Sequence, residues 1–83
     1  MKRVVYTHTA NKALSRMPTT TACLIRSKIE QYAKDPSSLA RNVVKLQDRE
    51  GYRLRVGDWR VIFDDEGTVL RILQIGPRGG IYE

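Results

Sequence analysis

Hydrophobic and polar residues alternate on both sides of Gly57-Asp58, with the period of a β-strand. Two such runs joined by a two-residue loop that contains Gly are typical of a tight β-hairpin. In this hairpin the large apolar side chains fall on one face, which suits a hydrophobic core. The apolar face carries Tyr52, Leu54, Val56, Trp59, Val61 and Phe63. The opposite face carries Arg53, Arg55 and Arg60, with Ile62 beside them.

A two-residue loop places Arg55 directly opposite Arg60. Like charges in facing positions weaken a strand pair, so this arrangement costs stability. An anion between the two side chains would relieve the repulsion, and phosphate suits the forked geometry of guanidinium. The hairpin therefore predicts a phosphate-binding face, against the simpler reading of a solvated basic surface.

Two helical patterns precede the hairpin and follow a short apolar strand at residues 4–6. The first pattern spans residues 10–17 and ends at Pro18. The second follows Thr19, Thr20 and Thr21, whose hydroxyls can cap a helix, and it stops at Asp35-Pro36. Its apolar residues recur at helical spacing and are Ala22, Ile25, Ile29 and Tyr32. We expect this apolar stripe to pack against the Trp59 and Phe63 face of the hairpin.

The rest of the chain is rich in strand patterns, with strands predicted near residues 43–46 and 68–75 around the hairpin. The order predicts an α+β fold in which two N-terminal helices pack on a small twisted antiparallel sheet. Without a repeat or linker, residues 1–83 are expected to form a single domain. For the second hairpin, which turns at residues 64–67, the sequence does not decide on which face of the sheet Arg71 lies. A shift of one residue in its register would move Arg71 to the other face.

The charge of the chain narrows the class of partner. Fifteen Lys and Arg against nine Asp and Glu give a net charge of +6, which favours nucleic acid or an acidic protein. No apolar run approaches the length of a membrane span, and no signal-peptide core is present, so we expect no membrane association. A single cysteine fits a reducing, cytoplasmic location. One His and one Cys are too few for a tight metal site, and we expect neither metal nor other cofactor.

Three segments of the sequence carry a family resemblance: the hairpin from Glu50 to Phe63, the ending Ile75 to Tyr82, and the run Ala13 to Pro18. Together they resemble the RelE/ParE superfamily of toxins from type II toxin–antitoxin systems. The resemblance implies the fold described above. It also implies a cognate antitoxin as partner, in a toxin–antitoxin hetero-oligomer.

RelE-like members of this superfamily cut mRNA on the ribosome without a metal. Their site consists of basic strand residues, a loop arginine and a terminal tyrosine. By resemblance, Arg60, Arg78 and Tyr82 are expected to be catalytic, and Arg53 and Arg55 to bind RNA phosphate. ParE-like members lack this set and poison DNA gyrase, which is the alternative function. A third alternative is a basic binding module that has lost nuclease activity.

The chemistry of RNA cleavage agrees with these roles. RNA supplies its own 2′-OH as nucleophile, so the protein must stabilise the charge that develops on the phosphate, as Arg60 and Arg78 would do. Tyr82 could accept the 2′-OH proton or stack on a base, and the sequence does not separate these roles. His8 is a second-tier candidate for the general acid. The arginines could also serve chiefly to bind an acidic segment of the antitoxin.

Overall fold

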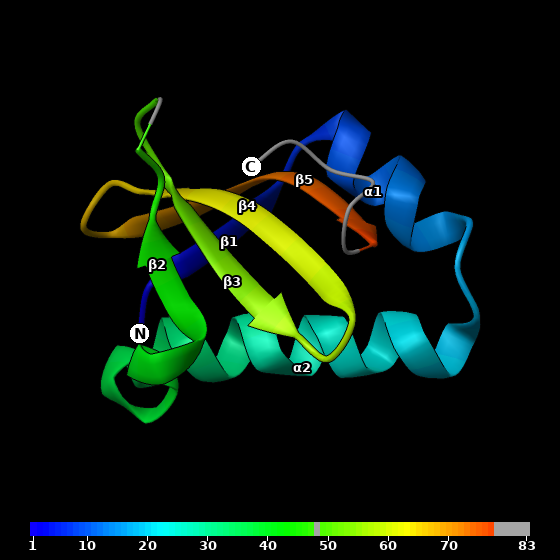
Figure 1. The fold of residues 1–83 in the computed structure, drawn as a ribbon, viewed down its shortest axis with the longest axis horizontal. Coiled ribbons are helices and arrows are strands. Elements are labelled where there is room, and N and C mark those ends of the chain that lie inside the picture. The colour runs from blue at the N-terminus through cyan, green and yellow to red at the C-terminus, as the bar shows by residue number, and fades with distance from the viewer. Residues whose placement is uncertain (48, 78–83) are drawn as a thin grey trace.

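The computed structural model describes residues 1–47 and 49–77 of the chain. Its elements run in the following order: β1 (Arg3–Tyr6), α1 (His8–Ser15), α2 (Thr19–Lys34), the 3-10 helix η1 (Pro36–Asn42), β2 (Val43–Lys45), β3 (Tyr52–Val56), β4 (Trp59–Asp65) and β5 (Val69–Pro77). The strands form one sheet in the order β1-β5-β4-β3-β2. Helix α2 crosses one face of this sheet, and α1 lies beside β5 (Figure 1).

The predicted α+β class, with two N-terminal helices packed on a small sheet, is confirmed by this arrangement. One strand pairing departs from a purely antiparallel sheet: β1 pairs with β5 in parallel, and the remaining neighbours are antiparallel. Parallel neighbours need a long crossover connection between them. The chain between β1 and β5, which contains α1, α2 and the other strands, is long enough to provide it. The sheet is therefore mixed, with the first strand at one edge.

Both helices differ from the sequence prediction at their N-termini. Helix α1 begins at His8 rather than Ala10, because the Thr7 hydroxyl caps it by accepting a hydrogen bond of 3.2 Å from the Ala10 amide. The predicted threonine cap of α2 is wrong, since Pro18 occupies the N-cap position and no side chain caps the helix. The proline fixes the backbone at this point without a capping hydroxyl. The end of α2 before Asp35 is as predicted.

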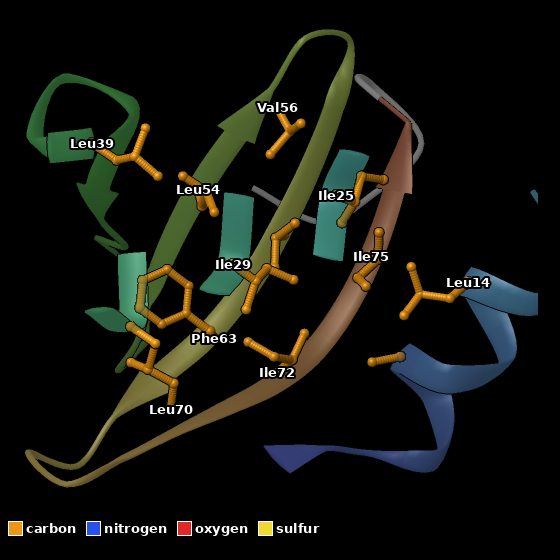
Figure 2. Close-up of a cluster of buried hydrophobic side chains, with 13 residues drawn as sticks. Leu14, Ile25, Ile29, Leu39, Leu54, Val56, Phe63, Leu70, Ile72 and Ile75 are labelled. Carbon is orange, nitrogen blue, oxygen red and sulfur yellow. The ribbon is translucent and has the colours of Figure 1, made fainter. Parts of the chain in front are cut away.

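The core lies between α2 and the apolar face of the sheet. Figure 2 shows Ile25 and Ile29 of α2 beside side chains from β3, β4 and β5. Phe63 is 2% exposed, and its ring centre lies 5.2 Å from that of Tyr32 and 5.6 Å from that of Tyr52. The predicted contact between the α2 stripe and the hairpin is thus confirmed, and it leaves the opposite face of the hairpin free of this core.

The register of the first hairpin agrees with the prediction, with Arg55 opposite Arg60 and Val56 opposite Trp59. Gly57 has a φ of +58°, as expected for the first residue of a type II′ turn, which favours glycine. The second hairpin contains an irregularity after Ile62 that leaves Leu73 without a partner on β4. As a result Arg71 lies opposite Asp64, on the same face as Arg55 and Arg60.

Candidate functional site

Three predicted site residues, Arg53, Arg55 and Arg60, lie on one face of the β3–β4 hairpin. The pairings Arg53 with Ile62 and Arg55 with Arg60 place them on the side opposite the core. We name this side of the sheet the arginine face, and Arg71 also belongs to it.

The three arginines differ in exposure. Arg60 is 9% exposed, Arg53 is half-buried and Arg55 is exposed. Guanidinium remains protonated in proteins, so Arg60 holds a positive charge with little access to water. Its strand, β4, has neighbours on both sides, and the adjacent Ile62 is fully buried. Arg60 is therefore the least exposed of the three cations and lies on an interior strand.

A pocket of about 190 Å³, which we name the arginine pocket, opens on the arginine face, where the end of η1 and the start of β2 meet the hairpin. It is lined by Arg41, Asn42, Val44, Arg53, Arg55 and Arg60. Among the described residues that line it, none carries a negative charge. The arginines predicted from the hairpin thus converge on one concave site with positive potential, which suits a phosphate group.

Arg41 and Asn42 were not singled out by the sequence. They precede β2, whose antiparallel register pairs Val43 with Leu54 and Val44 with Arg53. Continued backward, this register brings residues 41 and 42 toward Arg55 at the loop end of the hairpin. The signal was an Arg-Asn pair directly before a predicted strand, and it becomes informative only when the pairing of that strand is known.

A second pocket, of about 300 Å³, lies at the other end of β4 and is bordered by carboxylates. Its lining consists of Lys45, Glu50, Gly51, Tyr52, Asp64, Asp65 and Glu66. Asp65 accepts hydrogen bonds from Lys2 Nζ at 2.9 Å and from the Gly67 amide at 3.0 Å, and Glu66 Oε2 lies 3.5 Å from Arg71. Asp65 and Glu66 therefore stabilise the turn between β4 and β5.

The remaining sequence-predicted residues lie elsewhere. Arg78 and Tyr82 lie outside the described residues. In the last described strand, β5, Gly76 pairs with Arg60 of β4. His8 opens α1 and is exposed, and it does not line the arginine pocket. Over residues 1–47 and 49–77, no helix is long and apolar enough to span a membrane.

Comparison with known protein families identifies a match to this chain. A family model described as the ParE toxin of type II toxin–antitoxin systems, parDE, matches residues 4–82. No curated protein sequence matches the chain.

Solved structures share the fold. A chain of the archaeal RelE–RelB complex from Pyrococcus horikoshii OT3 is 28% identical, with a TM-score of 0.76 over 96% of this chain and 98% of that chain. A chain of the intact E. coli RelBE toxin–antitoxin complex is 17% identical, with a TM-score of 0.74 over 93% of this chain and 96% of that chain. The RelB–RelE complex from Methanococcus jannaschii gives 21% identity and a TM-score of 0.73, over 95% of each chain. Because the family model matches nearly the whole chain and the fold agrees, the chain belongs to the RelE/ParE superfamily of type II toxins.

Proposed function

We propose that this toxin is an endoribonuclease that cleaves mRNA on the ribosome by a metal-independent reaction. The observation that carries the proposal is the arginine pocket, in which Arg53, Arg55 and the buried Arg60 converge. A protein that only needed a basic surface would have no reason to bury one of these cations, because burial of charge is unfavourable. A fixed cation at the reacting phosphate is useful for catalysis, since it needs no reorganisation in the transition state.

In the proposed reaction, the ribose 2′-oxygen attacks the adjacent phosphorus and the bond from phosphorus to the 5′-oxygen breaks. One proton leaves the 2′-oxygen and one is taken up by the leaving 5′-oxygen. The products are a 2′,3′-cyclic phosphate and a free 5′-OH, so no water is consumed in this step. Arg60 stabilises the charge on the non-bridging oxygens, and Arg53 and Arg55 hold the backbone of the RNA. Loss of one such transition-state donor typically lowers the rate about a hundredfold to a thousandfold.

Arg78 and Tyr82 complete the proposed site. Arg78 would be a second cation at the phosphate, and Tyr82 would accept the 2′-OH proton or stack on a base. Guanidinium groups close to a phenol favour its phenolate form, so the role as base requires Tyr82 to lie beside the arginines of the pocket. Comparison of Tyr82→Phe with Tyr82→Ala separates the two: only stacking survives in the Phe variant.

The proposal includes two partners. The matched structures from E. coli and M. jannaschii are toxin–antitoxin complexes, and we propose that a cognate antitoxin likewise binds and neutralises this chain in a hetero-oligomer. The second partner is the ribosome with its mRNA. A small domain that contacts only the RNA backbone has little sequence specificity of its own, so the ribosome would set the position of the cut.

The test is a reconstituted translation reaction with purified toxin, in which primer extension maps the 5′ ends of the mRNA. We expect new ends on the translated message, and none on the same message without ribosomes. In an Arg60→Gln variant the rate at which these ends form should fall about a hundredfold or more. In Arg16→Gln, an exposed substitution at the end of α1, the rate should be unchanged. An uncut message would refute the nuclease proposal.

Inhibition of DNA gyrase is the second candidate, and the description of the matching family model favours it, since that model is named for the ParE toxin. A gyrase supercoiling assay with the same preparation tests it directly. Loss of supercoiling together with an uncut message would replace the first proposal by the second.

A further inference from the structure

We propose that Arg41 and Asn42 form a second wall of the arginine pocket and hold an RNA phosphate adjacent to the one at Arg60. This inference rests on the proposed function for the identity of its ligand, but RNA binding can be measured separately from cleavage.

The first argument is how firmly the two residues are positioned. They end η1 and directly precede β2, between two fixed points. On one side Leu39 is 7% exposed within the core, and on the other Val43 pairs with Leu54 and packs against the core. In Figure 1 this segment lies beside β3. Arg41 and Asn42 thus extend from short segments anchored at both ends, which holds their backbone in place better than a free loop would.

The second argument is charge. Arg41 is exposed, and within the described part of the chain neither Arg41 nor Arg55 has an ion-pair partner. Arg41 and Arg55 border the same pocket of about 190 Å³, so their charges repel each other in the absence of an anion. This arrangement is favourable when polyanion oxygens lie between the two guanidinium groups.

The third argument is size and spacing. The pocket is smaller than the roughly 300–1,000 Å³ typical of drug-sized ligand sites, which fits phosphate groups better than an enclosed nucleobase. Arg60 is on β4, and the segment of Arg41 leads into β2, two strands away. Two strand spacings are about 10 Å, so the backbones that carry Arg60 and Arg41 lie on opposite sides of the pocket. We assign an inner phosphate contact to Arg60 and an outer one to Arg41.

Asn42 fits the same role by its chemistry. Its side-chain amide can donate hydrogen bonds to phosphate oxygens, as Asn does at many protein–nucleic acid backbones, without adding charge. Val44 provides an apolar wall on the exposed side of the edge strand, where it is 47% exposed. We expect Arg41 to supply the charge-dependent part of the outer contact and Asn42 a smaller, salt-independent part.

The experiment measures binding of a fluorescein-labelled, single-stranded 12-mer RNA in which every ribose is 2′-O-methylated. This RNA has phosphates but no nucleophile, so it cannot be cut. Fluorescence anisotropy gives the affinity at several salt concentrations from 50 to 300 mM. The variants are Arg41→Ala, Arg41→Lys and Asn42→Ala, with Arg16→Ala as the matched loss of an exposed arginine outside the pocket.

We expect Arg41→Ala to weaken binding roughly five- to tenfold at the lowest salt. It should also reduce the slope of log affinity against log salt by about 0.7, the value for one contact to single-stranded nucleic acid. Arg41→Lys should keep most of the slope, since it keeps the charge. Asn42→Ala should weaken binding about twofold with no change in slope, and Arg16→Ala should match the native protein.

The outcomes separate this inference from the proposed function. An unchanged slope in Arg41→Ala, or no RNA binding by the native protein at 50 mM salt, overturns the inference even where the message is cleaved in translation. A slope reduced as expected, with no cleavage of translated mRNA, supports the outer phosphate contact and refutes the nuclease. Thermal unfolding of each variant shows whether a lost contact reflects a lost fold.

Discussion

Removal of the charge at Arg55 should make this protein more stable. Arg55 faces Arg60 across the β3–β4 hairpin, and Arg60 is 9% exposed. Side chains in this position start from Cβ atoms about 5 Å apart and can splay to about 8 Å between charges. At that distance, with an effective dielectric constant between ~20 and ~80, the repulsion is about 0.5–2 kcal/mol.

Cross-strand pairs of like charge fall near the lower end of this range, so we expect Arg55→Gln to raise the free energy of unfolding by about 0.5–1 kcal/mol. For a domain of this size that corresponds to a rise in melting temperature of about 3–6 °C. The assay is thermal and urea unfolding followed by circular dichroism, at 50 mM and 1 M NaCl. Because the screening length falls to about 3 Å at 1 M, the gain should become smaller there, although by less than for a fully exposed pair, since Arg60 is nearly buried.

The matched control is Arg16→Gln, which removes the same charge from the C-cap of α1. A cation there interacts favourably with the helix terminus, so this variant should be unchanged or less stable by a few tenths of a kcal/mol. The two variants should therefore differ in sign. The reasoning is refuted if Arg55→Gln is no more stable than the native protein at 50 mM NaCl, or if its gain persists unchanged at 1 M.

Three further substitutions test other features. Gly57→Ala should lower the free energy of unfolding by about 1–2 kcal/mol, because Gly57 has a φ of +58° and nothing but backbone strain opposes the added methyl group; urea unfolding measures it. Gln74→Met should raise the free energy of unfolding by about 1 kcal/mol in the same assay, since Gln74 Oε1 is buried with no hydrogen-bond partner in the described part of the chain. Burial raises the pKa of the Tyr6 phenol above its ordinary value of 10.0, so the folded state holds this proton more tightly and stability falls as the pH rises past 10. Tyr6→Phe should lose less stability than the native protein between pH 8 and pH 11, and an equal loss would contradict the role of Tyr6.

The hairpin could be predicted in detail because its signals are local. A two-residue loop at Gly57 permits one register, and alternation then assigns every side chain to a face. The opposition of Arg55 and Arg60 followed directly, and the structure has it. The local pattern thus gave the centre of the candidate site before any tertiary contact was known.

Features that depend on distant contacts did not follow from the sequence. The parallel pairing of β1 with β5 joins opposite ends of the chain. The face of Arg71 depends on the irregularity at Leu73, which no local residue announces. Arg41 and Asn42 reach the pocket only because burial of Leu39 and pairing of β2 fix the segment between them. Helix and strand periodicity contain no information on these contacts.

Three unfavourable features of this fold lie on the arginine face. Arg55 opposes a like charge, Arg60 is a nearly buried cation, and Gln74, which pairs with Ile62 on the same face, has a buried oxygen without a hydrogen bond in the described chain. The opposite face has a continuous apolar core against α2. Residues that reduce stability are expected where they serve function, because at other positions selection can replace them without loss of function. A stabilised Arg55→Gln variant that has lost RNA binding would show this exchange of stability for function in one side chain.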